Sequence, residues 1–262
     1  MDWHLERNSF TFAFGLCLWM CAGCSTEVAA VPPGAIVNVW AALPPPSDSS
    51  LPGLDEMALF ERVTDRLEER FILPRELRVV HLPCGTDQAF YDRGPRRIRM
   101  CDELLTKIEQ VVRKESADSE QDVLAQVRST LIWMFLHEVG HAFMHIFDLP
   151  VLGNEEDAAD GFAALALVDA GEAGMAESAV DYWAAVDAGS HDASDFADEH
   201  GLDLQRYYAG LCLVYGSDPE SHQSILDEGL LSKERAERCP EEYRELLRDW
   251  KAVLGDRLRE IP

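Results

Sequence analysis

The stretch LHEVGHAF, residues 136–143, places two histidines four positions apart, with a glutamate directly after the first. Residues i and i+4 lie on one face of an α-helix, so the ring nitrogens of His137 and His141 can bind one zinc ion while Glu138 lies beside it. This is the arrangement of the metal-binding helix of zinc metalloproteases. The pentapeptide also arises by chance, so the surrounding sequence has to support it.

Residues 123–147 are apolar almost all round a helix, which predicts a buried helix. Two neutral histidines and a carboxylate inside it would cost several kcal/mol unless they were paired or metal-bound. His145 continues the series by one turn, but three histidines so spaced would span about 11 Å, whereas a Zn–N bond is about 2 Å. We therefore expect His145 to support the site or the core rather than to bind the ion.

A third ligand is predicted in NEEDAAD, residues 154–160. Pro150 and Gly153 break the chain before it, which predicts a new helix that returns antiparallel beside the first. Glu156 and Asp160 are four residues apart and share a face of that helix. We expect Glu156 to be the third metal ligand and Asp160 to hold a ligand histidine in the correct tautomer.

Two alternatives to this assignment stay open. Glu155 and Asp157 are oxygen donors within one residue of Glu156, so either is a candidate ligand. A simpler explanation is that Asn154 caps the helix and the following acids complement the positive end of its dipole. That explanation covers the acids of the first turn but not Asp160.

The elements around the motif predict an α+β fold, with a small N-terminal sheet and a helix-rich C-terminal half. A helix is expected from residue 55 to 71 because its apolar residues recur at helical spacing and Pro74 forbids continuation. Three short stretches rich in β-branched and aromatic residues predict a strand meander, and helices should follow Cys101 and close the chain around Trp250. These stretches are ELRVVHLPCG, QAFYDRG and RRIRMC.

The N-terminus predicts export. Residues 10–23 form an uncharged apolar run that suits a signal-peptide core better than a membrane span. Ala22-Gly23-Cys24 resembles a lipobox, so a lipidated Cys24 could attach the protein to a membrane, although simple cleavage or an uncleaved anchor remains open. The expected location is a bacterial cell envelope or periplasm, or the medium if the protein is secreted.

The expected domain organisation has three parts. Residues 1–24 are the leader, and residues 25–54 form a Pro-rich tether in which AIVNVW could add an edge strand. Residues 55–262 form the folded domain. Its four cysteines predict two disulfides, and proximity in sequence favours Cys84 with Cys101 and Cys212 with Cys239 over the other connectivities or four buried thiols.

The charge of the chain excludes one class of partner. A formal net charge of -25 would repel a phosphate backbone, so we do not expect nucleic-acid binding. The usual role of such a charge is solubility, and it says little about the fold.

Several stretches together resemble a family of bacterial metallopeptidases of the gluzincin type, catalogued as a domain of unknown function. They cover most of the chain after about residue 55 and include AFYDRGPRRIRMCDEL, HEVGHAF, LPVLGNEEDAADGFA and DEHGLDLQRYYAGLCLVYGSDP. The resemblance implies a zincin-like fold with His137 and His141 as zinc ligands, Glu138 as general base and an acidic third ligand. The interval from His141 to Glu156 is short for a thermolysin-like gluzincin.

The mechanism implied is hydrolysis of a peptide or protein substrate by a zinc-activated water. Stabilising the oxyanion needs a further donor, for which His200 is the first choice by analogy with gluzincins and Arg206 the second. The alternative function is a zinc-binding or metal-free envelope protein that binds or acts as a scaffold without catalysis. The sequence indicates neither the cleavage specificity nor the oligomeric state.

Overall fold

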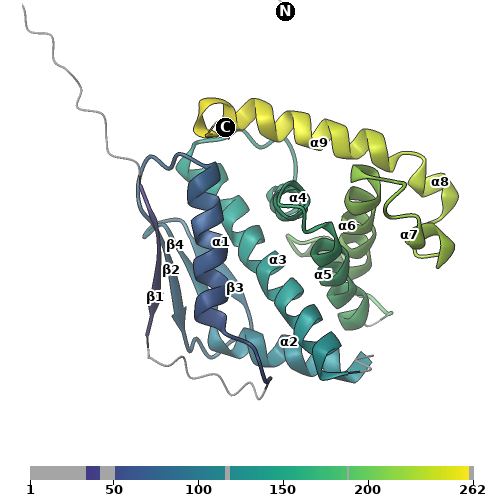
Figure 1. Cartoon of the computed structure of the whole chain (residues 1–262), viewed down its shortest axis with the longest axis horizontal. Helices are drawn as coiled ribbons and strands as arrows, with labels where there is room; N and C mark the ends of the chain where they lie inside the picture. The colour runs from purple at the N-terminus through teal and green to yellow at the C-terminus, as the bar shows by residue number, and fades with distance from the viewer. Residues whose placement is uncertain (1–33, 42–50, 116–118, 188, 260–262) are drawn as a thin grey trace, which may run out of the picture. The chain divides into compact units, whose positions relative to one another are not determined.

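Four short strands form one mixed sheet in the order β1-β2-β4-β3 (Figure 1). The computed structural model describes residues 34–41, 51–115, 119–187 and 189–259. The predicted leader, including Cys24, and most of the predicted tether lie outside them. The strands are β1 (Ile36–Trp40), β2 (Leu77–Leu82), β3 (Ala89–Asp92) and β4 (Arg97–Cys101).

The three predicted strand segments are confirmed, but the predicted meander is wrong. β4 lies between β2 and β3, pairing parallel with β2 and antiparallel with β3. The physical reason is burial: Ile98 and Met100 of β4 are as apolar and inaccessible as Leu77 and Val79 of β2, so both strands take central places. β3 is half-buried along its whole length and forms an edge.

Strand β1 lies within the stretch predicted as a tether and forms the opposite edge of the sheet. It pairs parallel with β2, from Ile36 beside Leu77 to Trp40 beside His81. The Asn38 side chain donates a hydrogen bond to the Thr64 hydroxyl on the first helix. The sheet therefore includes residues before position 55.

Helices dominate the rest of the described chain, and the α+β fold with a helix-rich C-terminal half is confirmed. No helix among these residues is both long and apolar enough to cross a membrane. The helices are α1 (Glu56–Arg70), α2 (Asp102–Glu115), α3 (Glu120–Ile146), α4 (Glu155–Asp169), α5 (Ala173–Val186), α6 (Asp203–Ser217), α7 (Ser224–Asp227), α8 (Lys233–Ala236) and α9 (Cys239–Leu254), with short 3-10 turns at Asp195–Ala197 and Gly255–Arg257.

The motif helix α3 lies between the sheet and the C-terminal helices (Figure 1). The Ser119 side chain caps it by accepting a hydrogen bond from the Asp122 N–H, and its apolar residues pack on both sides. Phe135, Val139 and Phe143 are fully buried. The prediction of a buried helix is confirmed.

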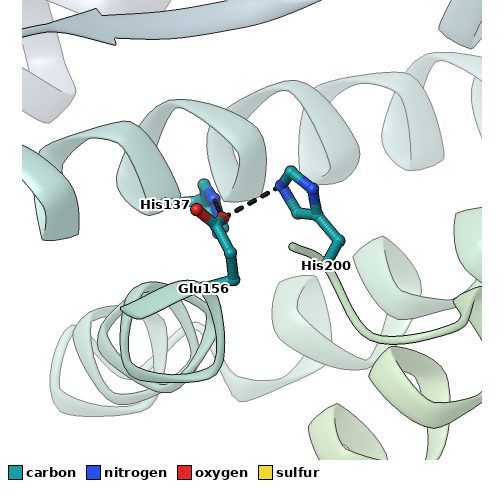
Figure 2. A group of neighbouring side chains, drawn as sticks. All are labelled: His137, Glu156 and His200. Atoms are coloured by element: carbon teal, nitrogen blue, oxygen red, sulfur yellow. Dashed lines mark hydrogen bonds and ion pairs between the residues drawn. The ribbon is translucent and has the colours of Figure 1, made fainter. Parts of the chain in front are cut away.

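Helix α4 crosses α3, so the predicted antiparallel return is wrong. Figures 1 and 2 show α4 along its axis where α3 is seen from the side. The crossing is close because both helices carry small residues there: a Cβ added at Gly140 would lie 3.0 Å from the Ala159 Cα. The crossing places Glu156 and Asp160 of α4 at His137, and Phe162 against Phe143.

Two disulfides close the structure, and both predicted pairings are confirmed. Cys84 is bonded to Cys101 beside the sheet, and Cys212 of α6 is bonded to Cys239 at the start of α9. The bridges are typical of a protein that folds in an oxidising, extracellular environment.

Candidate metal centre

Two of the three side chains that converge at the centre come from α3. The Nε2 atoms of His137 and His141 lie 3.1 Å apart, as expected for residues four apart on one helix. His137 is 5% exposed, and His141 is partly buried. The two rings therefore converge in a space that is largely shielded from solvent.

The third converging side chain is that of Glu156, in the first turn of α4. Its Oε2 lies 3.1 Å from the His137 Nε2 and 3.2 Å from the His141 Nε2. Asn154 does cap the helix, accepting a hydrogen bond from the Glu156 N–H, so the simpler explanation and the ligand geometry hold together. Glu156 thus faces both rings.

The neighbouring acids have other surroundings. Glu155 lies on the far side of His141, with its Oε1 2.8 Å from the ring Nδ1, and accepts a hydrogen bond from Arg93. Asp157 is exposed. Of the three acids that spacing leaves open, only Glu156 meets both Nε2 atoms.

The second nitrogens of the two rings are held by carboxylates. Asp160 Oδ1 lies 2.8 Å from the His137 Nδ1, and Glu155 Oε1 lies 2.8 Å from the His141 Nδ1. A neutral imidazole that donates its Nδ1–H to a carboxylate presents a lone pair at Nε2. Two such lone pairs and one carboxylate oxygen then point at one another, which is unfavourable unless a proton or a cation lies between them.

The charges at this point favour a positive species. Burial lowers the pKa of His141, but Glu156 and Glu155 raise it more strongly, to about 9. Burial raises the pKa of Glu156, and hydrogen bonds with His137, His141 and His200 lower it well below its usual range. The same convergence of acceptors that attracts a proton would attract a metal ion, so the donor set fits one.

His200, from the segment before α6, reaches the same Glu156 carboxylate beside His137 (Figure 2). Its Nε2 lies 2.9 Å from the Glu156 Oε2, and its Nδ1 lies 3.2 Å from an Asp198 carboxylate oxygen. His137, Glu156 and His200 form a second group that could hold an ion, overlapping the first. His141 fits better than His200 because its Nε2 lies close to both other donors.

A chain of polar contacts lies behind His137. Arg206 donates from Nε to the Asp160 Oδ2 at 2.7 Å and from Nη2 to the Oδ1 at 2.8 Å. The Trp133 indole N–H donates to the same carboxylate at 3.3 Å, and the Arg206 guanidinium lies 4.4 Å from the Trp183 ring centre. Both oxygens of the Asp160 carboxylate are therefore hydrogen-bonded, and its orientation toward His137 is fixed.

Glu138 is buried beside the converging donors, with 8% of its surface exposed. Burial raises the pKa of its carboxyl, against the opposing effect of the two histidines. Its carboxylate also accepts a hydrogen bond from the Tyr91 backbone on β3. A carboxyl whose pKa is raised in this way is suited to exchanging protons with a neighbouring group.

Other contacts at the centre were not predicted from the sequence. His145 is exposed rather than in the core, with its Nδ1 2.8 Å from the Tyr91 hydroxyl. Arg93 and Tyr91 lie beside or on β3, far in sequence from α3 and α4, and Trp133 lies on α3 one turn before His137. Their residue types alone carry no signal for the site. The centre opens into a cleft of about 1100 Å³ between β3, α2, α5 and the segment before α6.

Comparison with known proteins gives one match. The model of a family described as "Putative metallopeptidase" matches residues 47–254. No curated protein and no solved structure matches the chain.

Proposed function

Because the chain belongs to this family of metallopeptidases, we propose that it is a zinc-dependent peptidase that hydrolyses peptide bonds in the cleft. One observation carries the proposal: His137, His141 and Glu156 bring two imidazole nitrogens and a carboxylate oxygen to within 3.1 to 3.2 Å of one another. We assign these residues as the metal ligands.

The choice of zinc follows from the donor types and their spacing. Zinc binds imidazole nitrogen and carboxylate oxygen at about 2.0 to 2.2 Å in tetrahedral sites, which places two donors about 3.3 Å apart. The separations between the three donors lie just below this value. Three protein ligands would leave a fourth position, as catalytic zinc sites do.

In this mechanism zinc would supply a Lewis acid that lowers the pKa of a water molecule toward about 7. Glu138 would take a proton from the attacking water at its carboxylate and deliver it to the leaving amine nitrogen. Its burial supports this role, since the raised pKa brings the group toward the pH at which it must exchange protons.

His200 is the better of the two residues predicted to stabilise the oxyanion. The hydrogen bond with Glu156 raises the pKa of His200, which favours the ring form that donates from both nitrogens. Asp198 orients the ring at Nδ1. Both residues contact carboxylates, but the His200 side chain is 39% exposed at the cleft, whereas Arg206 is 16% exposed and holds the Asp160 carboxylate with two nitrogens. We therefore assign Arg206 to positioning His137 rather than to contact with substrate.

We also propose that the protein is exported. The two disulfides support an oxidising compartment, and we retain the sequence-based organisation of a leader over residues 1–24 with a tether after it. Attachment to a membrane through a lipidated Cys24 is part of this proposal. Intact mass measurement of the protein from its host would test it, since lipidation adds the mass of acyl chains to a chain that begins at Cys24.

The test of function measures metal content and cleavage in the same samples. The full chain, purified without chelator, is compared with His141→Ala, Glu138→Gln and His145→Ala by elemental mass spectrometry. His145→Ala is the matched control, because this histidine lies on the same helix but contacts Tyr91. We expect about one zinc per chain in the wild type, Glu138→Gln and His145→Ala, and little in His141→Ala.

The same four proteins are then incubated with a peptide library. Loss of a general base costs about 10² to 10⁴ in rate, so Glu138→Gln should cleave at least a hundred-fold more slowly while keeping its zinc. His145→Ala should stay active. Absence of zinc from the wild type after reconstitution would overturn the proposal and leave a metal-free envelope protein.

A further inference from the structure

One wall of the cleft lies beside the centre but has no part in the proposed chemistry. It consists of Tyr182 and Val186 of α5, Asp203 at the start of α6 and Asp87 in the loop before β3. Tyr182 is 8% exposed, Val186 and Asp203 are partly buried, and Asp87 is exposed. We call these four residues the acidic wall.

The cationic side chains around the cleft are mostly committed elsewhere. Arg93 pairs with Glu155, and Arg206 pairs with Asp160. Within the part of the chain that the structure describes, Asp87 and Asp203 form no ion pair or hydrogen bond. Lys107 also lines the cleft, so the two carboxylates of the acidic wall outnumber it.

Asp203 is the carboxylate whose position has an energetic consequence. Burial, and then Asp187, raise the pKa of its carboxyl against the effects of Arg206, His191 and His200. Its place in the first turn of α6 favours the ionised form through the helix dipole. Arg206 is the cation with the largest effect on Asp203, but its guanidinium is already paired with Asp160. A cationic group entering the cleft would give this partly buried carboxylate an ion-pair partner of its own and so lower the cost of its burial.

Asp87 and Asp203 act on the same part of the cleft. Burial and then these two carboxylates raise the pKa of the Tyr182 hydroxyl to about 12, so both lie within electrostatic range of it. Asp87 precedes β3 and Asp203 begins α6, so the two carboxylates of the acidic wall come from different elements. Leu104 and Met134 line the same cleft and add apolar surface.

We propose that this end of the cleft is a subsite for a lysine or arginine side chain of the peptide substrate. Asp203 and Asp87 bind the charged end, and Tyr182 and Val186 contact the methylene stem, because long cationic side chains bury their stems against apolar surface. The proposal rests on the proposed function and names its substrate class: peptides with a basic residue next to the cleaved bond.

The test measures binding separately from cleavage. Two libraries of acetylated, dye-labelled hexapeptides differ only in carrying lysine or the uncharged isostere norleucine at one position. Their affinity for the zinc-loaded Glu138→Gln protein is measured by fluorescence anisotropy, with and without Asp203→Asn or Asp87→Asn. Asp65→Asn is the matched control, because it removes one exposed charge on α1, outside the cleft.

A charge-assisted contact corresponds to about a ten-fold change or more in affinity. We expect the lysine library to bind about ten-fold more tightly than the norleucine library, and Asp203→Asn to reduce this ratio to within about two-fold. Asp87→Asn should reduce it partly, and Asp65→Asn should leave it unchanged. Asp87→Asn also serves as the second variant if Asp203→Asn fails to fold.

Equal binding of the two libraries would overturn the subsite, whether or not the wild type cleaves peptides. A lysine preference that persists in both cleft variants would also overturn it. If the preference depends on Asp203 but the wild type cleaves neither library, the subsite stands and the proposed hydrolysis fails. The two proposals are therefore distinguishable in one set of samples.

Discussion

At the scale of single residues, the orientation of His137 depends on groups that are not metal ligands. Asp160 lies at its Nδ1, and Arg206 holds Asp160 through two hydrogen bonds of 2.7 and 2.8 Å. The Arg206 side chain is itself fixed against Trp183. A guanidinium holds a carboxylate in two places at once, which lysine cannot do.

Arg206→Met should weaken zinc binding without removing a ligand. Loss of a partner of this kind typically costs 10- to 100-fold in metal affinity or activity, and here it would also leave Asp160 buried without its cation. Arg206→Lys keeps the positive charge but cannot make both hydrogen bonds to Asp160. Its zinc affinity should lie between those of the wild type and Arg206→Met. Competition with a chromophoric chelator measures the zinc affinity, and an unchanged affinity in Arg206→Met would contradict the positioning role.

Glu56 gives a pH dependence to stability. Burial, and then the nearby Asp102, raise its pKa to about 7, from 4.5 in the unfolded chain. The folded state therefore binds more protons between these values, and the stability that this group contributes below pH 4.5 is lost as the pH rises through 7.

Glu56→Gln should remove that loss. At pH 8 the variant should unfold with a free energy higher by on the order of 2 kcal/mol, whereas at pH 4 the two proteins should be nearly equal. Urea unfolding at the two pH values measures the difference. A difference that does not change with pH would show that Glu56 titrates normally.

At the scale of elements, the centre is formed where α3 and α4 cross. Gly140 lies between His137 and His141 on the contact face of α3, and an added Cβ would lie 3.0 Å from the Ala159 Cα and 3.3 Å from the Phe162 Cβ. The nearest of these atoms is backbone, so the contact cannot be relieved by a side-chain rotation. The small residue allows α4 to bring Glu156 to the histidines.

Gly140→Ala should separate the two helices and weaken zinc binding. Overpacking costs about 1 to 3 kcal/mol, and the gain in helix propensity of about 1 kcal/mol offsets only part of it. We expect lower stability by about 1 kcal/mol and a zinc affinity lower by on the order of ten-fold. Gly174→Ala is the control: it lies in α5 with no atom within 4 Å of the added Cβ, and it should be neutral or stabilising.

At the scale of the whole molecule, the disulfides connect the elements that carry the cleft. The Cys84–Cys101 bridge closes a segment that contains β3, the strand that contacts Glu138 and His145. The Cys212–Cys239 bridge joins α6, which carries Arg206, to α9. Each bridge limits the freedom of the unfolded chain.

The double variant Cys84→Ala with Cys101→Ala should lower the free energy of unfolding by about 3 kcal/mol, given a sequence separation of 17 residues. Denaturant unfolding measures this value. Reductant should lower the stability of the wild type at least as far, because it opens both bridges, and it should affect the variant only through Cys212–Cys239. A variant as stable as the wild type would mean that β3 is held by its other contacts alone.

The sequence by itself determined the features that depend on local spacing. Four-residue intervals placed His137 with His141, and Glu156 with Asp160, on common faces of their helices. Apolar periodicity predicted α1 and α3, and cysteine proximity predicted both bridges. These relations lie within one helix or one short segment, where the spacing along the sequence fixes which residues are close in space.

Only the tertiary structure decided how the segments meet. The crossing of α3 and α4, the central place of β4, and the contacts of Glu155 with His141 and of Arg206 with Asp160 all join distant parts of the chain. Glu155 and Glu156 are adjacent and chemically identical, so no local pattern separates their roles. The packing of α4 on α3 decides which face of α4 meets the histidines, so that Glu156 lies at both Nε2 atoms and Glu155 at the Nδ1 of His141. Small residues where the helices meet allow this close approach.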